Sequence, residues 1–312
     1  MSENKDIRNP HPDFKTVEAS RPDWDPKALR YTKTPDPSWT YGSGPNATSS
    51  VASPPRSNAT STPPAHIPID PYAANRPPGA NYKLLISSIA PRPIALLSTR
   101  SPDEARDSDA EKDNLAPFSF FNVLSHDPPL FALGFACSLA RPKDSLRNLV
   151  DTRECVINLV GEPLLEAANA ASIDSPRGVS EWVVSGLTPV RDAETVRCAR
   201  VAEAVVSIEA KLDFVREYES RGAPGRIGST VVIVEGTRFW VRGDAVNEDR
   251  SVVDLSVLRP ISRLGGISYG RTTEAVELLR PVFEETLGMD GYEKLKEKRR
   301  QQERQLQNGE PN

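Results

Sequence analysis

AVVSIEAKLDFVREYE, residues 204–219, alternates apolar and polar side chains over most of its length. This alternation is typical of a half-buried antiparallel strand. TVVIVEGTRFWVRG, residues 230–243, has a similar pattern and follows a glycine-containing connection at 220–228. The two segments therefore predict a long β-hairpin.

Shorter elements are predicted upstream of this hairpin. Apolar runs predict strands at 94–99, 115–125, 130–136 and 154–160, and helical patterns are found at 81–90, 143–152 and 164–171. The Pro91-Arg92-Pro93 turn must end the first of these helices. Mostly antiparallel strands with a few peripheral helices predict a mainly β fold, a small barrel rather than a doubly wound sheet.

The composition divides the chain into three regions. About half of the 29 prolines lie in the first 80 residues, which cannot hold many uninterrupted helices or central strands. Residues 1–66 are predicted to be a disordered or extended Pro/Ser-rich region, residues 67–287 the folded barrel, and residues 288–312 a charged helical tail. Aromatic residues within 14–45 leave open whether that part docks as an extended strap, whereas 48–64 has the composition of a flexible linker.

Charge and cysteine content exclude several classes of protein. The net charge of −4 gives no reason to expect nucleic acid or a membrane as a partner. The three cysteines include Cys137 and Cys155 in apolar runs, where a buried, reduced thiol is expected. The N-terminus lacks the apolar region of a signal peptide, and no segment is apolar over the ~18 residues that a membrane span needs. We therefore expect a cytoplasmic protein.

No set of side chains in the sequence forms a recognisable hydrolytic motif. The G-x-S-x-G and H-E-x-x-H patterns are absent from the sequence. The glycine-rich segment Gly265–Gly270 lacks the spacing of a dinucleotide-binding loop. A bound cofactor therefore has to be considered as the source of any chemistry.

The segment Arg141-Pro-Lys143-Asp144-Ser145 is the best candidate anion site. Asp144 or Ser145 can cap the following helix, whose first-turn amides could then meet a phosphate. Lys143 would add a positive charge and Ser145 a hydroxyl donor. The alternative is an ordinary capped helix beside a solvated lysine.

The segment Asn114–Asn122, with the sequence NLAPFSFFN, is the second informative stretch. A strand that carries Ser119 and Asn122 among three phenylalanines offers both stacking area and hydrogen-bonding groups. This mixture suits a planar heteroaromatic ligand. The alternative is a core strand with two satisfied polar groups.

Taken in order, these pieces resemble the flavin-reductase-like FMN-binding family, in particular its flavoprotein oxygenase-like branch. The matching segments are Ala90–Thr99, Asn114–Asn122, Ser125-x-Asp-Pro-Pro-Leu130, Lys143-Asp-Ser145 with Asn148, and Arg259-Pro-Ile-Ser-Arg-Leu-Gly-Gly266. The resemblance covers roughly Tyr82 to Arg280. It implies an FMN-binding split β-barrel that forms a homodimer.

The resemblance also implies which residues hold the cofactor. Those expected to meet the ring or the ribityl chain are Ser98, Ala116, Pro117, Ser119, Phe120 and Asn122. Lys143 and Ser145 would hold the phosphate, Arg92 is a further phosphate or ribityl contact, and Arg263 with Tyr269 would close the site. The family often has threonine where Ser145 stands. The first 66 residues and the charged 101–113 segment lie outside the family pattern.

The function implied by the resemblance is an FMN-dependent oxidoreductase. It would take hydride from NAD(P)H and pass electrons to a flavin, to oxygen or to another small organic acceptor. Two alternatives remain open: a non-catalytic FMN-binding module with a regulatory or docking role, and a barrel related to pyridoxamine-phosphate oxidase. The charged tail is either a solvated helix or a partner-binding one.

Overall fold

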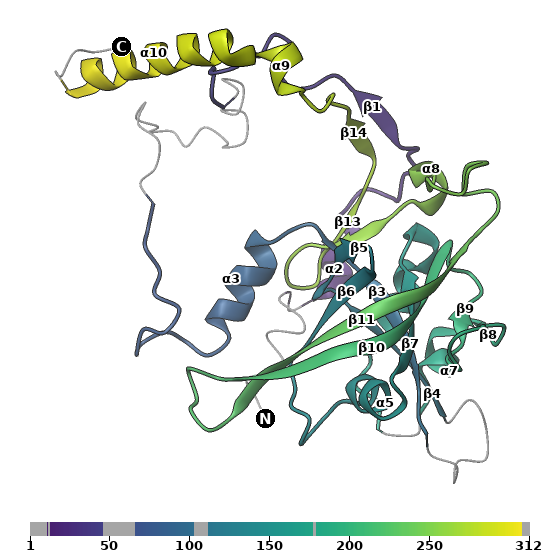
Figure 1. Cartoon of the computed structure of the whole chain (residues 1–312). Helices are drawn as coiled ribbons and strands as arrows, with labels where there is room; N and C mark the ends of the chain where they lie inside the picture. Colours follow the sequence, from purple (N-terminus) through teal and green to yellow (C-terminus); the bar gives the residue numbers. More distant parts are fainter. Residues whose placement is uncertain (1–10, 12, 46–65, 103–111, 177–178, 308–312) are drawn as a thin grey trace. The chain divides into compact units, whose positions relative to one another are not determined.

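The computed structural model describes residue 11 and residues 13–45, 66–102, 112–176 and 179–307 (Figure 1). The chain forms two compact units, one of Met1–Leu29 with Ile69–Thr272 and one of Arg30–Pro68 with Thr273–Asn312. The predicted linker at 48–64 lies outside the described residues, as does most of the charged 101–113 segment.

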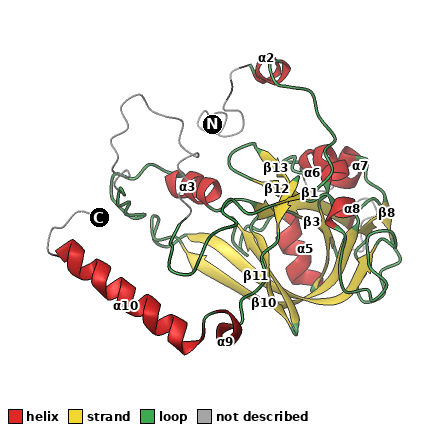
Figure 2. Cartoon of the chain, turned by 90° about the horizontal axis from the view of Figure 1, so that it is seen from above, coloured by secondary structure: helices red, strands yellow, loops and turns green. Residues whose placement is uncertain are grey.

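Seven antiparallel strands form the main sheet of the first unit. In spatial order they are β4 (Asp113–Phe118), β3 (Ala95–Arg100), β7 (Glu154–Leu159), β10 (Val206–Glu219), β11 (Ile227–Val241), β6 (Pro129–Phe135) and β5 (Phe121–His126). Figure 2 shows that the sheet is strongly curved, with α5 (Asp144–Thr152) against it. The predicted mainly β fold is thus confirmed.

The alternating pattern correctly predicted the β10–β11 hairpin, which lies in the middle of the strand order of this sheet (Figure 1). The first half of β10 pairs with β7, and the first half of β11 pairs with β6. Residues Val206–Ala210 are buried on both faces, so alternation of exposure begins only after them. The far half of β10, from Asp213 to Glu219, pairs only with β11 within the described part of the chain, and most of its residues are exposed.

The prediction of a single strand over 115–125 is wrong. The chain bends at Ser119 and Phe120, so that β4 and β5 lie at opposite ends of the strand order. The carbonyl of Phe120 accepts a hydrogen bond from the amide of Gly134 at 2.8 Å, which draws the bend onto β6. A side chain at Gly134 would approach Cβ of Phe120 to 3.0 Å, so this close approach requires glycine. The bend itself contains neither glycine nor proline, and local sequence gave no signal of it.

Two hydrophobic clusters lie on opposite faces of β3. Leu97 belongs to the cluster that the sheet forms with Leu146 and Leu149 of α5. Leu96 belongs to a second cluster beneath η2 (Glu162–Leu164), α6 (Leu165–Ala170) and α7 (Glu181–Ser185). Burial on both faces explains why β3 reads as a continuous apolar run rather than as an alternating one. The predicted helices at 143–152 and 164–171 are both present.

Smaller elements complete the first unit. They are α2 (Phe14–Ala19), α3 (Ala80–Ser88), β2 (Arg92–Pro93), β8 (Pro189–Val190), β9 (Arg200–Val201), α8 (Leu255–Leu258), β12 (Ile261–Arg263) and β13 (Tyr269–Arg271). β2, β12 and β13 form a three-stranded sheet. The glycine-rich 265–270 segment makes the turn between β12 and β13, closed by a hydrogen bond from the Leu264 amide to the Ser268 carbonyl.

The second unit pairs segments from the two ends of the chain. β1 (Arg30–Thr32) runs parallel to β14 (Glu274–Val276), and Arg30 forms an ion pair with Glu274. α9 (Phe283–Thr286) and α10 (Gly288–Gln307) follow, which confirms the predicted helical character of the charged tail. No helix in the described part of the chain is both long and apolar enough to cross a membrane.

Candidate functional site

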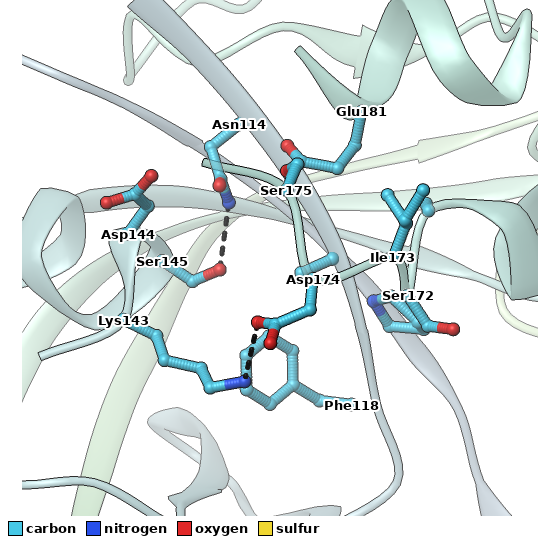
Figure 3. A pocket seen from close by; sticks show the side chains of 13 residues that line it. Asn114, Phe118, Lys143, Asp144, Ser145, Ser172, Ile173, Asp174, Ser175 and Glu181 are labelled. Carbon is cyan, nitrogen blue, oxygen red and sulfur yellow. Dashed lines mark hydrogen bonds and ion pairs between the residues drawn. The ribbon is translucent and has the colours of Figure 1, made fainter. Parts of the chain in front are cut away.

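A cavity of about 320 Å³ opens in the first unit between β4, the start of α5 and the connection from α6 to α7 (Figure 3). We call it the α5 pocket. Its lining consists of Asn114, Ala116, Pro117, Phe118, Lys143, Asp144, Ser145, Ala171, Ser172, Ile173, Asp174, Ser175 and Glu181. The volume is at the lower end of the range for small-molecule sites, which is roughly 300–1,000 Å³.

The N-terminus of α5 meets this pocket without a side-chain cap among the described residues. Lys143 occupies the N-cap position, and its side chain has no oxygen to accept from the first-turn amides. The prediction that Asp144 or Ser145 caps the helix is therefore wrong, since both lie within its first turn. An uncapped N-terminus keeps amide donors and a partial positive charge available to an anion.

Two buried polar side chains form the floor of the pocket beside α5. The Nδ2 of Asn114 donates to the Oγ of Ser145 at 2.8 Å and to Oγ1 of Thr99 at 3.4 Å. Ser145 is only 4% exposed. Because its oxygen already accepts from Asn114, its hydroxyl proton is oriented for an acceptor elsewhere.

Charges of both signs line the pocket. Nζ of Lys143 lies 3.7 Å from Oδ1 of Asp174, and both side chains are exposed, so this ion pair is weak. Glu181, at the start of α7, is 8% exposed. Its carboxylate accepts from the amide of Leu115 at 3.4 Å and from the hydroxyl of Ser175.

The structure brings together four of the residues predicted for the cofactor site. Ala116 and Pro117 on β4 and Lys143 and Ser145 on α5 line the same pocket. The first two were predicted to meet the ring or the ribityl chain, and the last two the phosphate. This grouping does not by itself test those roles, which stay predictions.

Four other predicted residues lie away from the lining of the pocket. Ser98 is completely buried on the face of β3 that carries Leu96, and its Oγ has no hydrogen-bond partner in the described part of the chain. Ser119 and Phe120 lie at the bend after β4. The Oδ1 of Asn122, on β5, accepts from the neighbouring amide of Val123 at 2.9 Å.

Arg92 is held by the backbone rather than directed into the pocket. Its guanidinium donates to the carbonyls of Ile86 at 2.6 Å, Leu264 at 2.7 Å and Ile89. Burial, together with the positive charge of Arg263, lowers the pKa of Arg92. The side chain thus joins the end of α3 to the 264 turn, and this arrangement does not favour the predicted phosphate contact.

Arg263 and Tyr269 contact each other beside the pocket rather than inside it. The guanidinium of Arg263 lies 4.4 Å from the ring centre of Tyr269. The hydroxyl of Tyr269 donates to Oδ1 of Asn169 at 2.8 Å, at the end of α6. Since the carbonyl of Asn169 accepts from both the amide and the hydroxyl of Ser172, Tyr269 supports one wall of the pocket indirectly.

Sequence reasoning missed the wall formed by 171–175 and Glu181. These residues have no motif spacing relative to Lys143, and only the fold places them opposite it. Asn114 was part of a quoted motif, but its role beneath Ser145 depends on a contact between β4 and α5. The local signal for this wall is the acidic residue that begins the EWVVS helix, ahead of three apolar residues.

Cys155 and Cys198 are buried thiols that stay protonated. Cys155 is completely buried, and burial raises the pKa of its thiol well above the ordinary value. Burial likewise raises the pKa of Cys198 to about 12. Cys137, predicted to be buried, is partly exposed.

The residues of this site lie within a segment that is similar to known proteins. The flavin reductase like domain matches residues 87–256, more than half of the chain. An uncharacterized protein of Halalkalibacterium halodurans is 35% identical over 204 residues, which are 65% of this chain and 92% of that protein.

Solved structures agree with this match. Nitrilotriacetate monooxygenase component B from Bacillus cereus is 28% identical with a TM-score of 0.61, covering 69% of this chain and 100% of that one. The 2-nitrobenzoate 2-nitroreductase NbaA of Pseudomonas fluorescens is 27% identical with a TM-score of 0.58, covering 70% and 98%. A Shewanella frigidimarina structure described as a flavin reductase with a split barrel domain is 20% identical with a TM-score of 0.52, covering 67% and 94%.

The family match includes every strand of the main sheet and every residue that lines the α5 pocket. The chain therefore belongs to the flavin reductase like domain family, and its first unit has the split-barrel fold of that family.

Proposed function

We propose that the chain binds FMN at the α5 pocket and acts as an FMN-dependent oxidoreductase with NAD(P)H as hydride donor. The observation that carries this proposal is the uncapped N-terminus of α5, with Lys143 beside it, inside a domain of the flavin reductase like family. A phosphate dianion satisfies both the free first-turn amides and the lysine.

The residues present fit such a cofactor. Lys143, Ser145 and the α5 amides would hold the phosphate, and Ala116, Pro117 and Phe118 offer an apolar wall next to it. A cavity of about 320 Å³ suits the phosphate and the ribityl chain, so the ring system would extend beyond it. The predicted ring contacts that lie outside the cavity are consistent with this division.

A bound flavin supplies a ring that accepts hydride, so the protein need not supply a nucleophile or a general base. The side chains of the pocket have the task of binding and orienting the cofactor. The neutral, buried cysteine thiols are consistent with this absence of side-chain chemistry. Electrons would pass to a flavin, to oxygen or to an organic acceptor.

A second candidate function is a non-catalytic FMN-binding module that docks to a partner. The favouring observation is that the whole segment 273–312 lies outside the family match and exposes large apolar side chains. Leu278 and Leu279 are 78% and 97% exposed. Such residues are typical of a surface that another molecule covers.

One preparation can decide between these functions. The purified protein is examined by visible absorbance, and any cofactor released by heat is identified by mass. FMN near one equivalent per chain, with oxidation of NADH or NADPH in the presence of free flavin, oxygen or a nitroaromatic acceptor, supports the enzyme. Stoichiometric FMN without turnover supports the binding module. A folded protein that neither carries nor takes up FMN contradicts both.

A further inference from the structure

Glu181 is a buried carboxylate in the wall of the α5 pocket, and two hydrogen-bond donors reach it from the residues that the structure describes. Its oxygens accept from the Leu115 amide at 3.4 Å, longer than the usual 2.9–3.0 Å, and from the Ser175 hydroxyl. An ionised carboxylate offers about four acceptor positions. Neither of these two donors carries a charge.

Two other buried glutamates show how this chain otherwise satisfies such groups. Glu209 accepts from two backbone amides, from the hydroxyl of Thr195 and from the indole of Trp240. Glu162 is paired with the guanidinium groups of Arg259 and Arg271. Of these three, Glu181 is the one in the lining of the α5 pocket, and it has the fewest hydrogen-bond donors among the described residues.

Glu181 and Lys143 make the two sides of the pocket chemically different. Figure 3 shows the two side chains on opposite sides of the cavity, with Asn114 and Asp174 between them. The Lys143 side attracts an anion, whereas the Glu181 side repels one and requires hydrogen-bond donors. A ligand that fits both sides carries an anionic group at one end and hydroxyl groups several atoms away.

We propose that Glu181 determines ligand specificity by accepting hydrogen bonds from the hydroxyl groups of a polyol chain. For the proposed cofactor this chain is the ribityl group, so the inference rests on the proposed function. Lys143 then selects the phosphate and Glu181 selects the polyol. Each side chain acts on a different part of the ligand, so their contributions separate when those parts are removed one at a time.

The test measures dissociation constants of FMN, riboflavin and lumiflavin, which has no ribityl chain, for the full-length protein. Glu181→Gln keeps the size of the side chain and removes its charge. We expect riboflavin and FMN to bind about tenfold more weakly, because charged acceptors make stronger hydrogen bonds, with lumiflavin unchanged. Ser175→Ala is the matched control. It removes a hydrogen bond to Glu181 but keeps the carboxylate, so the preference for riboflavin over lumiflavin should persist.

The outcomes separate the inference from the proposed function. An equal loss for lumiflavin and riboflavin in Glu181→Gln would show a merely structural role and overturn the inference, as would unchanged binding of riboflavin. A folded wild-type protein that binds none of the three flavins overturns the proposed function as well. If Glu181→Gln does not fold, Glu181→Asp, which retracts the carboxylate, must reduce the riboflavin-to-lumiflavin preference for the inference to stand.

Discussion

Arg92 and Glu181 show at the scale of single residues how partners decide a role. Arg92 is a cation in a family motif, yet its two terminal nitrogens donate to backbone carbonyls at the end of α3 and in the 264 turn. Glu181 belongs to no motif, yet it lies in the pocket, where two hydrogen-bond donors reach it from the described residues. The chemical type of a side chain therefore does not determine its role by itself. The groups that surround it in the fold decide which of its interactions form.

Glu162 gives a prediction at this scale. Burial acts to raise the pKa of its carboxyl, but hydrogen bonds and charge from Arg271 and Arg259 outweigh this effect and lower the pKa below its ordinary value of 4.5. Glu162→Gln should reduce the free energy of unfolding by about 2 to 3 kcal/mol near neutral pH, since it leaves two arginines without their anion. Urea denaturation measures this loss.

The contribution of Glu162 to stability should depend on pH in a defined direction. A lowered pKa stabilises the folded state fully above pH 4.5, and the stabilisation is lost as pH falls through the folded-state value. The difference between wild type and Glu162→Gln should therefore shrink well below pH 4.5. Asp244→Asn, which breaks the exposed ion pair with Arg242, is the control and should change stability little. A difference that stays constant down to low pH would contradict this account.

At the scale of elements, the start of α5 lacks a side-chain cap among the described residues. An N-cap serine or threonine satisfies a first-turn amide, whereas Lys143 satisfies none. The helix is instead held by Leu146 and Leu149, which are completely buried in the main cluster. An anion that meets the free amides would supply what the N-cap lacks.

Lys143→Ser tests whether a side-chain cap stabilises α5 and at the same time weakens FMN binding. The new hydroxyl should cap α5 and stabilise the ligand-free protein by about 0.5 to 1 kcal/mol. FMN affinity should fall about tenfold, because a charge is lost and an amide is occupied. Urea denaturation without ligand and FMN titration measure the two effects. Lys143→Ala should weaken FMN binding without the gain in stability, and equal stability of the two variants would argue against the capping explanation.

Gly161 follows β7 in the chain and lies against the segment that precedes β12. It forms a bridge with Pro260, and a Cβ at this position would meet the carbonyl oxygen of Leu258 at 2.4 Å. Gly161→Ala should therefore lower the free energy of unfolding by about 2 kcal/mol, since backbone atoms must move apart. Gly243→Ala is the control, because no atom lies within 4 Å of a Cβ there. Thermal denaturation that shows equal melting temperatures for the two variants would contradict the close approach.

At the scale of the whole molecule, the pocket and the charged tail belong to different units. Every residue that lines the α5 pocket lies within the first unit, whereas α10 belongs to the second. Deletion of residues 288–312 should therefore change FMN affinity by less than about twofold, a difference too small to count as a lost contact. FMN titration of the truncated and full-length proteins measures this. A loss of tenfold or more, on the order of one good hydrogen bond, would show that the tail takes part in the site.

The sequence by itself determined the mainly β fold, the long hairpin and the helices at 81–90, 143–152 and 164–171. It also determined that Lys143 and Ser145 lie together at the start of one helix. These features follow from periodicity and from neighbours in the chain, which are local properties. The family resemblance also rested on short segments in order, and the comparisons confirmed it.

Only the tertiary structure decided the bend at Ser119 and Phe120, the backbone partners of Arg92, and the position of Glu181 across from Lys143. Each of these depends on contacts between residues far apart in the chain, such as Phe120 with Gly134 and Leu115 with Glu181. Such contacts become favourable only when the sheet closes and both partners lose water together, so no local pattern encodes them.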